Sequence, residues 1–413
     1  MALTKFNKHV LTLVFGTSFA QALLVCASPI LTRIYTPDDF GVFTLFFSVI
    51  MIFSAIINLR YELAITLPED ENDAINLCAL AFIINCTISL IVFLCIIIFH
   101  TPISNIFNNG KIDTWLYFIP LAVFLIGLFN ILNYFNIRKE NYKEISKATV
   151  LKSISTLCAQ LIIGVVKVGP AGLIIGNMFG NAIANIKLFK SFMTIDIYKV
   201  VSKKNMYKLM YRYKNFPKYS VWSILSNKLA YHINDILISL FFSLASLGFY
   251  SIIQRVLALP SSLLGTSVSQ VFLQKGTEEK KEKGNIKNIF SQTITKMFLF
   301  AIPFFGLSFV VVEDIFSFVF GKNWAIAGEY AKILIPFFFI RFIVVSVSTT
   351  EVIMEKQKTG LYFNLIFLTF CISVIVILQH KPFETFLTYF SIIGSIIYFL
   401  YGVVLYYISK GRI

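Results

Sequence analysis

Charged residues are scarce in this sequence, and their scarcity excludes a soluble globular protein. They make up 14% of the 413 positions, whereas hydrophobic residues make up 57%. The mean hydropathy is +0.78. An ordinary soluble domain is about one quarter charged, and a chain this apolar would expose surface that it could not cover in water. The composition therefore predicts a protein that lies in a bilayer.

Motifs of catalytic and metal chemistry are also lacking. The six cysteines fall inside apolar stretches, with no CxxC spacing and no pairing with histidine. They are interpreted as small hydrophobic side chains rather than as disulfides or metal ligands. The chain contains no P-loop, HExxH, GxSxG or DxD motif, so neither ATP hydrolysis nor sugar transfer is visibly encoded. We predict that the protein is not an enzyme, has no metal site and needs no cofactor.

Long apolar stretches recur along the whole chain. They are continuous rather than alternating, which favours helices over barrel strands. About 20 apolar residues make one spanning helix. The pattern predicts an all-α polytopic membrane protein with twelve transmembrane helices, near residues 10–31, 41–57, 75–99, 115–137, 149–166, 171–188, 221–240, 248–272, 290–312, 327–349, 361–378 and 385–408.

The distribution of basic residues predicts the orientation of these helices. The chain has 36 Lys and Arg against 21 Asp and Glu, a net charge of +15 that in a soluble protein would suggest nucleic acid. With twelve spans, one set of connections lies on the side of both termini and holds most of the cations. The opposite set holds only Arg33, Lys111, Lys167, Lys322 and Lys381. Because basic loops stay in the cytoplasm, both termini are predicted to be cytoplasmic, and no nucleic-acid partner is needed to explain the charge.

The longest connection divides the chain into two halves. It is basic and aromatic and covers residues 189–220. This position predicts an N-terminal bundle of six helices at 1–188 and a C-terminal bundle of six helices at 221–413. The connection either lies on anionic lipid or serves as a plain cytoplasmic linker.

Charged residues inside spans are costly and usually face a cavity, so they indicate function. The predicted spans contain more cations than anions. Asp235 is an anion deep in a span, whereas Glu329 and Glu351 lie nearer the ends of the tenth span. This excess of cations suits an anionic substrate such as a lipid diphosphate. The cations at this depth are Lys152, Lys228, Arg255, Lys296, Lys332 and Arg341.

The seventh span carries a polar face. Lys228, His232, Asp235 and Ser239 recur at steps of four, three and four, which places them on one side of a helix. In a functional interpretation Lys228 contacts phosphate and Asp235 is its partner or a charge switch. Alternatively, a Lys–Asp pair only locks helices together. His232 beside Asp235 makes either a proton site or a hydrogen-bonded cavity histidine.

Two deep arginines are further candidates. Arg255 precedes Pro260 in the eighth span, and Arg341 follows Pro336 in the tenth. A guanidinium presents a planar fork of donors that matches phosphate oxygens, so both are predicted to bind substrate unless they snorkel or pair across helices.

The remaining candidates lie nearer the span ends. Lys332 belongs to the tenth span, and Lys152 and Lys296 lie close enough to the predicted cytoplasmic ends to snorkel. Arg33 extends a polar stripe of the first span, which either lines the cavity or serves helix packing.

Small residues form a stripe in the sixth span. Gly172, Gly176, Gly180 and Ala184 repeat every four residues. Stripes of this kind let two helices approach closely in a membrane. We assign this one to packing, with the neighbouring asparagines as interhelical hydrogen bonds.

Four longer stretches resemble the polysaccharide biosynthesis (Wzx-type) flippases. ILTRIYTPDDFGVFTLF (30–46) and RYELAITLPEDENDAINL (60–77) resemble their amino-terminal half. DILISLFFSLASLGFYSIIQRVLALP (235–260) and FGKNWAIAGEYAKILIPFFFIRFI (320–343) resemble their carboxy-terminal half. Of the candidate residues, Asp235, Arg255, Lys332 and Arg341 fall within the two carboxy-terminal stretches.

The resemblance implies the fold of the multidrug/oligosaccharidyl-lipid/polysaccharide (MOP) exporters, with two six-helix bundles around a central cationic cavity that opens to each side in turn. It also implies a bacterial inner-membrane protein that moves an undecaprenyl-diphosphate-linked oligosaccharide repeat unit to the periplasmic leaflet, for O-antigen or capsular polysaccharide. In such flippases cationic side chains hold the diphosphate and the polyprenyl tail stays in lipid. A polymerase and a chain-length regulator of the same pathway are expected partners.

Two rival functions stay open. In a drug or metabolite exporter of the same fold, Asp235 would carry a proton or Na⁺, but deep carboxylates are few. In a membrane polymerase of surface sugars, a large outer loop would hold the active site, whereas the longest predicted outer connection is only HTPISNIFNNGKIDT (100–114). Lipid II flippases usually carry two more spans than the twelve predicted, which counts against lipid II as the substrate.

Overall fold

The structure is a computed structural model that describes residues 5–107, 110–166, 169–193 and 200–411. Lys167, one of the cations assigned to the outer connections, lies outside these ranges. Within them the secondary structure is helical, without strands. Backbone contacts divide the chain into a first unit, Met1–Leu240, and a second unit, Phe241–Ile413.

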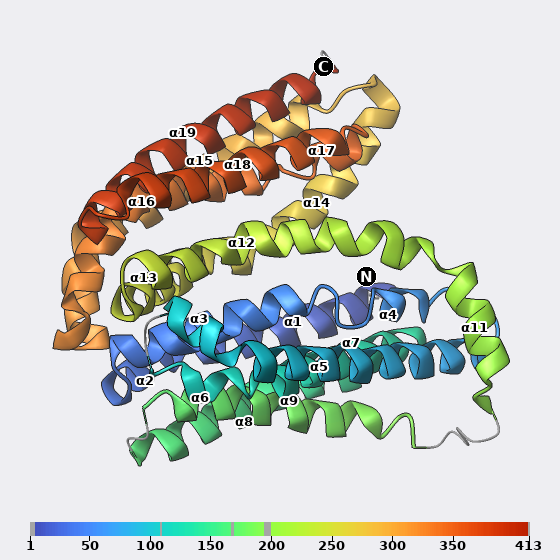
Figure 1. The fold of residues 1–413 in the computed structure, drawn as a ribbon. Helices are drawn as coiled ribbons and strands as arrows, with labels where there is room; N and C mark the ends of the chain where they lie inside the picture. Colours follow the sequence, from blue (N-terminus) through green and yellow to red (C-terminus); the bar gives the residue numbers. More distant parts are fainter. Residues whose placement is uncertain (1–4, 108–109, 167–168, 194–199, 412–413) are drawn as a thin grey trace. The chain divides into compact units, whose positions relative to one another are not determined.

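The first unit is a bundle of long helices joined by short ones (Figure 1). Its long members are α1 (Lys5–Cys26), α3 (Pro37–Phe53), α5 (Glu71–Phe107), α7 (Ile119–Arg138), α8 (Tyr142–Val165), α9 (Ala171–Phe189) and α12 (Val221–Phe241). The short ones are α2 (Ser28–Ile34), α4 (Tyr61–Ala64), α6 (Asp113–Leu116), α11 (Lys203–Arg212) and the π-helix η1 (Phe216–Ser220).

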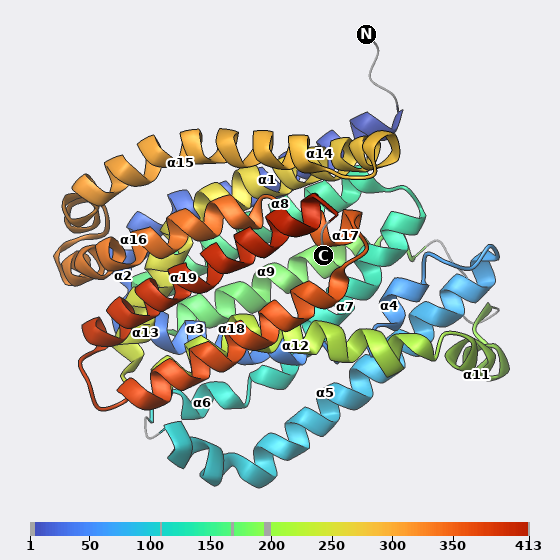
Figure 2. The same cartoon turned by 90° about the horizontal axis from the view of Figure 1, so that it is seen from above.

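The second unit is likewise built of long helices, which Figure 2 shows from above. They are α13 (Leu244–Leu257), α14 (Leu259–Lys283), α15 (Lys287–Ile315), α16 (Ala325–Val345), α18 (Gln357–Leu378) and α19 (Phe383–Ser409). Short turns of helix, η2 (Phe316–Phe320), η3 (Lys322–Trp324) and α17 (Thr350–Ile353), complete it.

Helices of membrane-spanning length occur in both units. In the described ranges, eight segments are long and apolar enough to cross a bilayer, and Leu244–Leu257 is a shorter apolar helix. The all-α polytopic architecture is thereby confirmed. Each of the twelve apolar stretches lies largely on a helix, but the number of spans stays a prediction. The boundaries of the two predicted bundles also stay a prediction. Backbone contacts group α12 with the first unit, whereas the predicted C-terminal bundle begins at residue 221.

The motif YTPDDFG at the start of α3 has a structural role. Thr36 is the N-cap: its hydroxyl accepts from the backbone N–H of Asp39, and the Asp39 carboxylate accepts from the Thr36 N–H at 2.9 Å. Pro37 follows as the first helical residue, where a missing N–H costs nothing. This capping box satisfies donors that a helix start leaves without partners.

The glycine stripe of α9 packs against α8, as predicted. A Cβ at Gly180 would lie 2.0 Å from Thr156 Oγ1 and 2.7 Å from the Lys152 carbonyl oxygen. At Gly172 it would lie 1.9 Å from the Tyr35 hydroxyl. The prediction for the asparagines is right in part, because Asn185 donates across to the Leu125 carbonyl of α7 at 2.9 Å while Asn181 bonds within its own helix.

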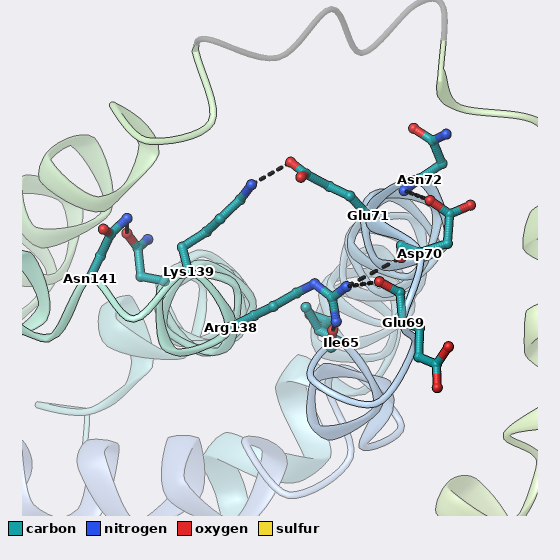
Figure 3. Close-up of polar contacts among 9 residues, drawn as sticks. Ile65, Glu69, Asp70, Glu71, Asn72, Arg138, Lys139 and Asn141 are labelled. Atoms are coloured by element: carbon teal, nitrogen blue, oxygen red, sulfur yellow. Dashed lines mark hydrogen bonds and ion pairs between the residues drawn. The ribbon is translucent and has the colours of Figure 1, made fainter. Parts of the chain in front are cut away.

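An arginine at the end of α7 holds the connection between α4 and α5 (Figure 3). The Arg138 guanidinium donates to the carbonyls of Ile65 at 3.4 Å, Glu69 at 3.1 Å and Asp70 at 3.3 Å, and also to that of Pro68. The adjacent Lys139 pairs with Glu71, in the first turn of α5. Both residues fall in a predicted connection between spans, where the structure shows that they fix the path of the chain.

Replacing Arg138 by Ala is expected to destabilise the protein by about 1–3 kcal/mol, because the carbonyls of residues 65–70 lose a charged donor. Arg138→Lys should recover only part of this, since an ammonium lacks the planar fork. Thermal unfolding in detergent measures the effect. Lys143→Ala, an exposed cation of α8, is the matched control. Equal melting of Arg138→Ala and wild type would show that the contacts carry no stability.

Candidate functional site

The polar face predicted for the seventh span lies on α12. Asp235 and Ser239 are buried, and Lys228 and His232 are partly buried. Asp235 makes its hydrogen bonds with α3 rather than with Lys228, and no ion pair joins Lys228 to Asp235 within the described chain. The Lys228–Asp235 partnership expected from the sequence is therefore absent from this arrangement.

A serine of α3 completes the cluster around Asp235. The Ser48 hydroxyl donates to Asp235 Oδ2 at 2.7 Å, and His232 Nδ1 lies 3.2 Å from the same hydroxyl. His232 Nδ1 also lies 3.5 Å from Asp235 Oδ2, and Asp235 is only 7% exposed. We call Ser48, His232 and Asp235 the acid–imidazole cluster.

The acid–imidazole cluster brings three polar groups together inside the first unit. The carboxylate of Asp235 and the imidazole of His232 both lie within hydrogen-bond reach of the Ser48 hydroxyl. Sequence reasoning found His232 and Asp235 by their helical spacing but missed Ser48. The only available signal was one serine in the apolar run of α3, 187 positions from Asp235.

Lys152 lies in a polar pocket of the first unit, where helices α1, α7 and α8 meet. The pocket has a volume of about 420 Å³, and Thr17, Gln21 and Asn133 contribute to its lining. The Lys152 ammonium lies 4.9 Å from the centre of the Phe129 ring, which stabilises it by a cation–π contact. The ammonium thus stays among side chains of the bundle, although its sequence position allowed it to snorkel.

Two features of this pocket leave it ready for an anionic or hydroxyl-bearing ligand. No carboxylate pairs with Lys152 among the described residues. The buried Oδ1 of Asn133 also has no hydrogen-bond partner there. A cation and a free acceptor in one pocket offer both a charge and a hydrogen bond to a polar ligand.

An ion pair with a buried carboxylate lies outside the residues that the sequence predicted. Glu62 is only 2% exposed and accepts from Arg60 at 3.2 Å. Burial raises the pKa of the Glu62 carboxyl, and Arg60 opposes the rise. Arg60 and the preceding Leu59 have φ of 64° and 46°, in the left-handed region that costs a non-glycine residue energy.

Hydrogen bonds on either side of the left-handed turn at Leu59 and Arg60 hold this turn in place. The Asn58 amide donates to the Gly127 carbonyl of α7 at 2.9 Å, and the Tyr61 hydroxyl donates to the Met210 carbonyl of α11 at 3.0 Å. Arg60 also acts electrostatically on Lys228. The structure thereby brings a cation of the α3–α4 connection close to a cation that the sequence assigned to the candidate site.

The other predicted residues are placed as follows. Arg33 is exposed on α2 of the first unit. In the second unit, Arg255 lies on α13 and is partly buried. Arg341 lies on α16, with its guanidinium 5.9 Å and 5.8 Å from the rings of Phe337 and Phe338. Lys332, on the same helix, pairs with Glu313 at 2.8 Å.

Comparison with known proteins finds a matching family and a shared fold. A family model described as polysaccharide biosynthesis protein matches residues 30–328. None of the curated proteins compared with the chain matches it. The solved structures that match are those of transporters and a flippase.

Several solved structures share the fold at low sequence identity. The inward-facing form of a multidrug resistance MATE family transporter of the MOP superfamily has a TM-score of 0.73 and 14% identity, over 97% of this chain and 98% of that one. The lipid II flippase MurJ in an inward closed form has a TM-score of 0.76 and 14% identity, over 97% and 90%. A MOP superfamily transporter from Pyrococcus furiosus, described by the reverse polarity of its binding pocket, has a TM-score of 0.57 and 14% identity, over 98% and 96%.

Proposed function

The chain belongs to the polysaccharide biosynthesis protein family, and from this we propose that it is a flippase for an undecaprenyl-diphosphate-linked oligosaccharide. It moves the repeat unit of an O-antigen or capsular polysaccharide from the cytoplasmic to the periplasmic leaflet of a bacterial inner membrane, with both of its own termini in the cytoplasm. The family match over residues 30–328 carries the proposal. The MOP fold and the cations inside the helices support it.

The interior cations bind the diphosphate in this proposal. Lys152 has the clearest geometry, because its ammonium lies in a pocket that also contains Asn133, whose amide oxygen can accept a hydrogen bond from a sugar hydroxyl of the repeat unit. Further positive charge comes from Lys228 and Arg33 in the first unit and from Arg255 and Arg341 in the second, whereas the charge of Lys332 is offset by Glu313. Binding on the cytoplasmic side and release on the other follow from two conformations of the bundles with different affinity for the anionic headgroup.

The acid–imidazole cluster would couple transport to a proton gradient. It holds a titratable carboxylate and a titratable imidazole within hydrogen-bond reach of one hydroxyl. A proton gained or lost there changes the charge inside the first unit, and through it the balance between conformations. A polymerase and a chain-length regulator of the same pathway would use the delivered repeat units.

Deletion of the gene tests the proposed function. We expect the deletion strain to lack surface polysaccharide and to accumulate lipid-linked repeat units on the cytoplasmic face of the membrane, because their passage is blocked. Labelling of lipid-linked sugars in inverted and right-side-out vesicles measures the sidedness, and the wild-type gene on a plasmid should restore export. Normal polymer in the deletion strain would rule the proposal out.

One observation favours an ion-coupled exporter as a second candidate. The buried acid–imidazole cluster would suit a carrier that exchanges a small molecule for a proton. In that case the same deletion strain would keep its polysaccharide and become sensitive to toxic compounds. The two candidates therefore separate in a single strain.

A further inference from the structure

A long apolar cavity lies within the first unit, between α3, α5 and α12. Its volume is about 880 Å³. The side chains that line it are aliphatic or aromatic, apart from Cys95. Phe53 of α3, Val92 and Ile96 of α5 and Trp222 of α12 represent the helices that form its walls. A cavity so free of polar groups suits a hydrocarbon ligand.

The bend of α5 shapes one wall of this cavity. The helix departs from helical geometry at Phe99, with φ −104° and ψ 17°, and Pro102 follows inside it. Figure 2 shows the resulting curve of α5. Ile96 before the bend and Ile103 after it both line the cavity. The bend therefore gives the cavity a concave wall, which a straight helix would not provide.

The lining of the cavity follows α5 over a long stretch. It runs from Ile88 to Phe107, on both sides of the bend. The contour of this stretch is roughly 28 Å at 1.5 Å per residue. A long single hydrocarbon chain that follows the bent wall keeps apolar contact along the whole contour.

Cations mark one end of the cavity. Leu59 lines it and is followed by Arg60, and Leu225 lines it one helical turn before Lys228. Arg60 and Lys228 act on each other electrostatically, and Glu62 neutralises only one of the two charges. A ligand that fits is therefore a hydrocarbon chain with an anionic head.

We propose that this cavity binds the polyprenyl tail of the lipid-linked substrate, with its diphosphate toward Arg60 and Lys228. The inference rests on the proposed function and adds to it, since the tail is then guided by the protein rather than left in bulk lipid. A continuous apolar wall keeps the polyprenyl tail in contact with hydrophobic side chains while the headgroup crosses the membrane.

Binding of undecaprenyl diphosphate to the purified full-length protein, measured by native mass spectrometry, tests the proposal. Ile96 is 6% exposed and lines the cavity, whereas Ile98 is 69% exposed and lies outside its lining. We expect Ile96→Trp to weaken binding by about tenfold or more, and Ile98→Trp to leave it unchanged. Equal binding by wild type and Ile96→Trp would overturn the assignment.

Three further measurements keep the result unambiguous. In the wild-type protein, undecaprenyl diphosphate with a photoreactive tail should label residues 88–107, and labelling elsewhere would contradict the proposal without any variant. Phosphatidylglycerol that competes equally well would identify an ordinary phospholipid site instead. Lys228→Gln should weaken binding of the diphosphate but not of undecaprenol, and equal loss of both would refute the cationic end.

Failure of the tail site and failure of the proposed function give different results. If the tail does not bind this cavity, the wild-type gene still restores polysaccharide to the deletion strain, and so does Ile96→Trp. If the protein is not a flippase of lipid-linked sugars, the deletion strain makes normal polysaccharide whatever binds in the cavity.

Discussion

Replacing Lys152 by Ala is expected to lower surface polysaccharide by roughly tenfold to a hundredfold, because a hydrogen bond to a charged group is worth about 1.5–3 kcal/mol. The ammonium lies in a polar pocket with no paired carboxylate among the described residues, so its removal leaves no buried acid unpaired. The loss should therefore fall on transport rather than on folding. Complementation of the deletion strain, with polymer and membrane protein both quantified, measures it.

The same helix provides the control for Lys152. Lys147 is exposed on α8 and pairs with Glu144 at 2.9 Å. Lys147→Ala should leave polysaccharide unchanged, because an exposed ion pair contributes little. Lys152→Arg keeps the charge and should retain more export than Lys152→Ala. If Lys147→Ala and Lys152→Ala support equal amounts of polymer, the pocket has no part in substrate binding.

Gly180→Leu is expected to destabilise the protein by about 3 kcal/mol or more, which is the upper range for overpacking. A Cβ there would lie within 2.7 Å of a backbone oxygen of α8, and backbone cannot move aside as a side-chain tip can. Helices α8 and α9 would have to separate. Size-exclusion chromatography of the detergent-solubilised protein should show aggregate in place of a single peak.

Gly306 offers the matched control for Gly180. It lies on α15, and a Cβ built there meets no atom within 4 Å. Gly306→Leu should therefore give the wild-type elution profile. A normal profile for Gly180→Leu would mean that the two helices tolerate a wider separation than the structure has.

Helical spacing alone predicted much of the architecture and one face of the candidate site. His232 and Asp235 lie on a polar face of α12, as their three-residue separation requires. The glycine stripe of α9 packs closely for the same reason, because spacing of four residues fixes which side chains share a face.

Contacts between distant segments could not be predicted in this way. Ser48 joins Asp235 from another helix, and nothing local to either residue indicates the pair. Arg60 falls in a predicted connection, and its sequence position does not indicate that it lies beside a buried glutamate. Lys152 was expected to snorkel from its depth, whereas the ring of Phe129 and the pocket keep it inside.

The hydrogen bonds that Arg138 makes at the end of α7 limit how the α4–α5 connection can change in evolution. Arg138 binds the α4–α5 connection through main-chain oxygens, which every amino acid supplies. The side chains of Thr66 and Glu69 can therefore change in evolution without loss of these hydrogen bonds. A single-residue insertion between Ile65 and Asp70 would shift the oxygens out of register, so this connection should vary in sequence while keeping its length.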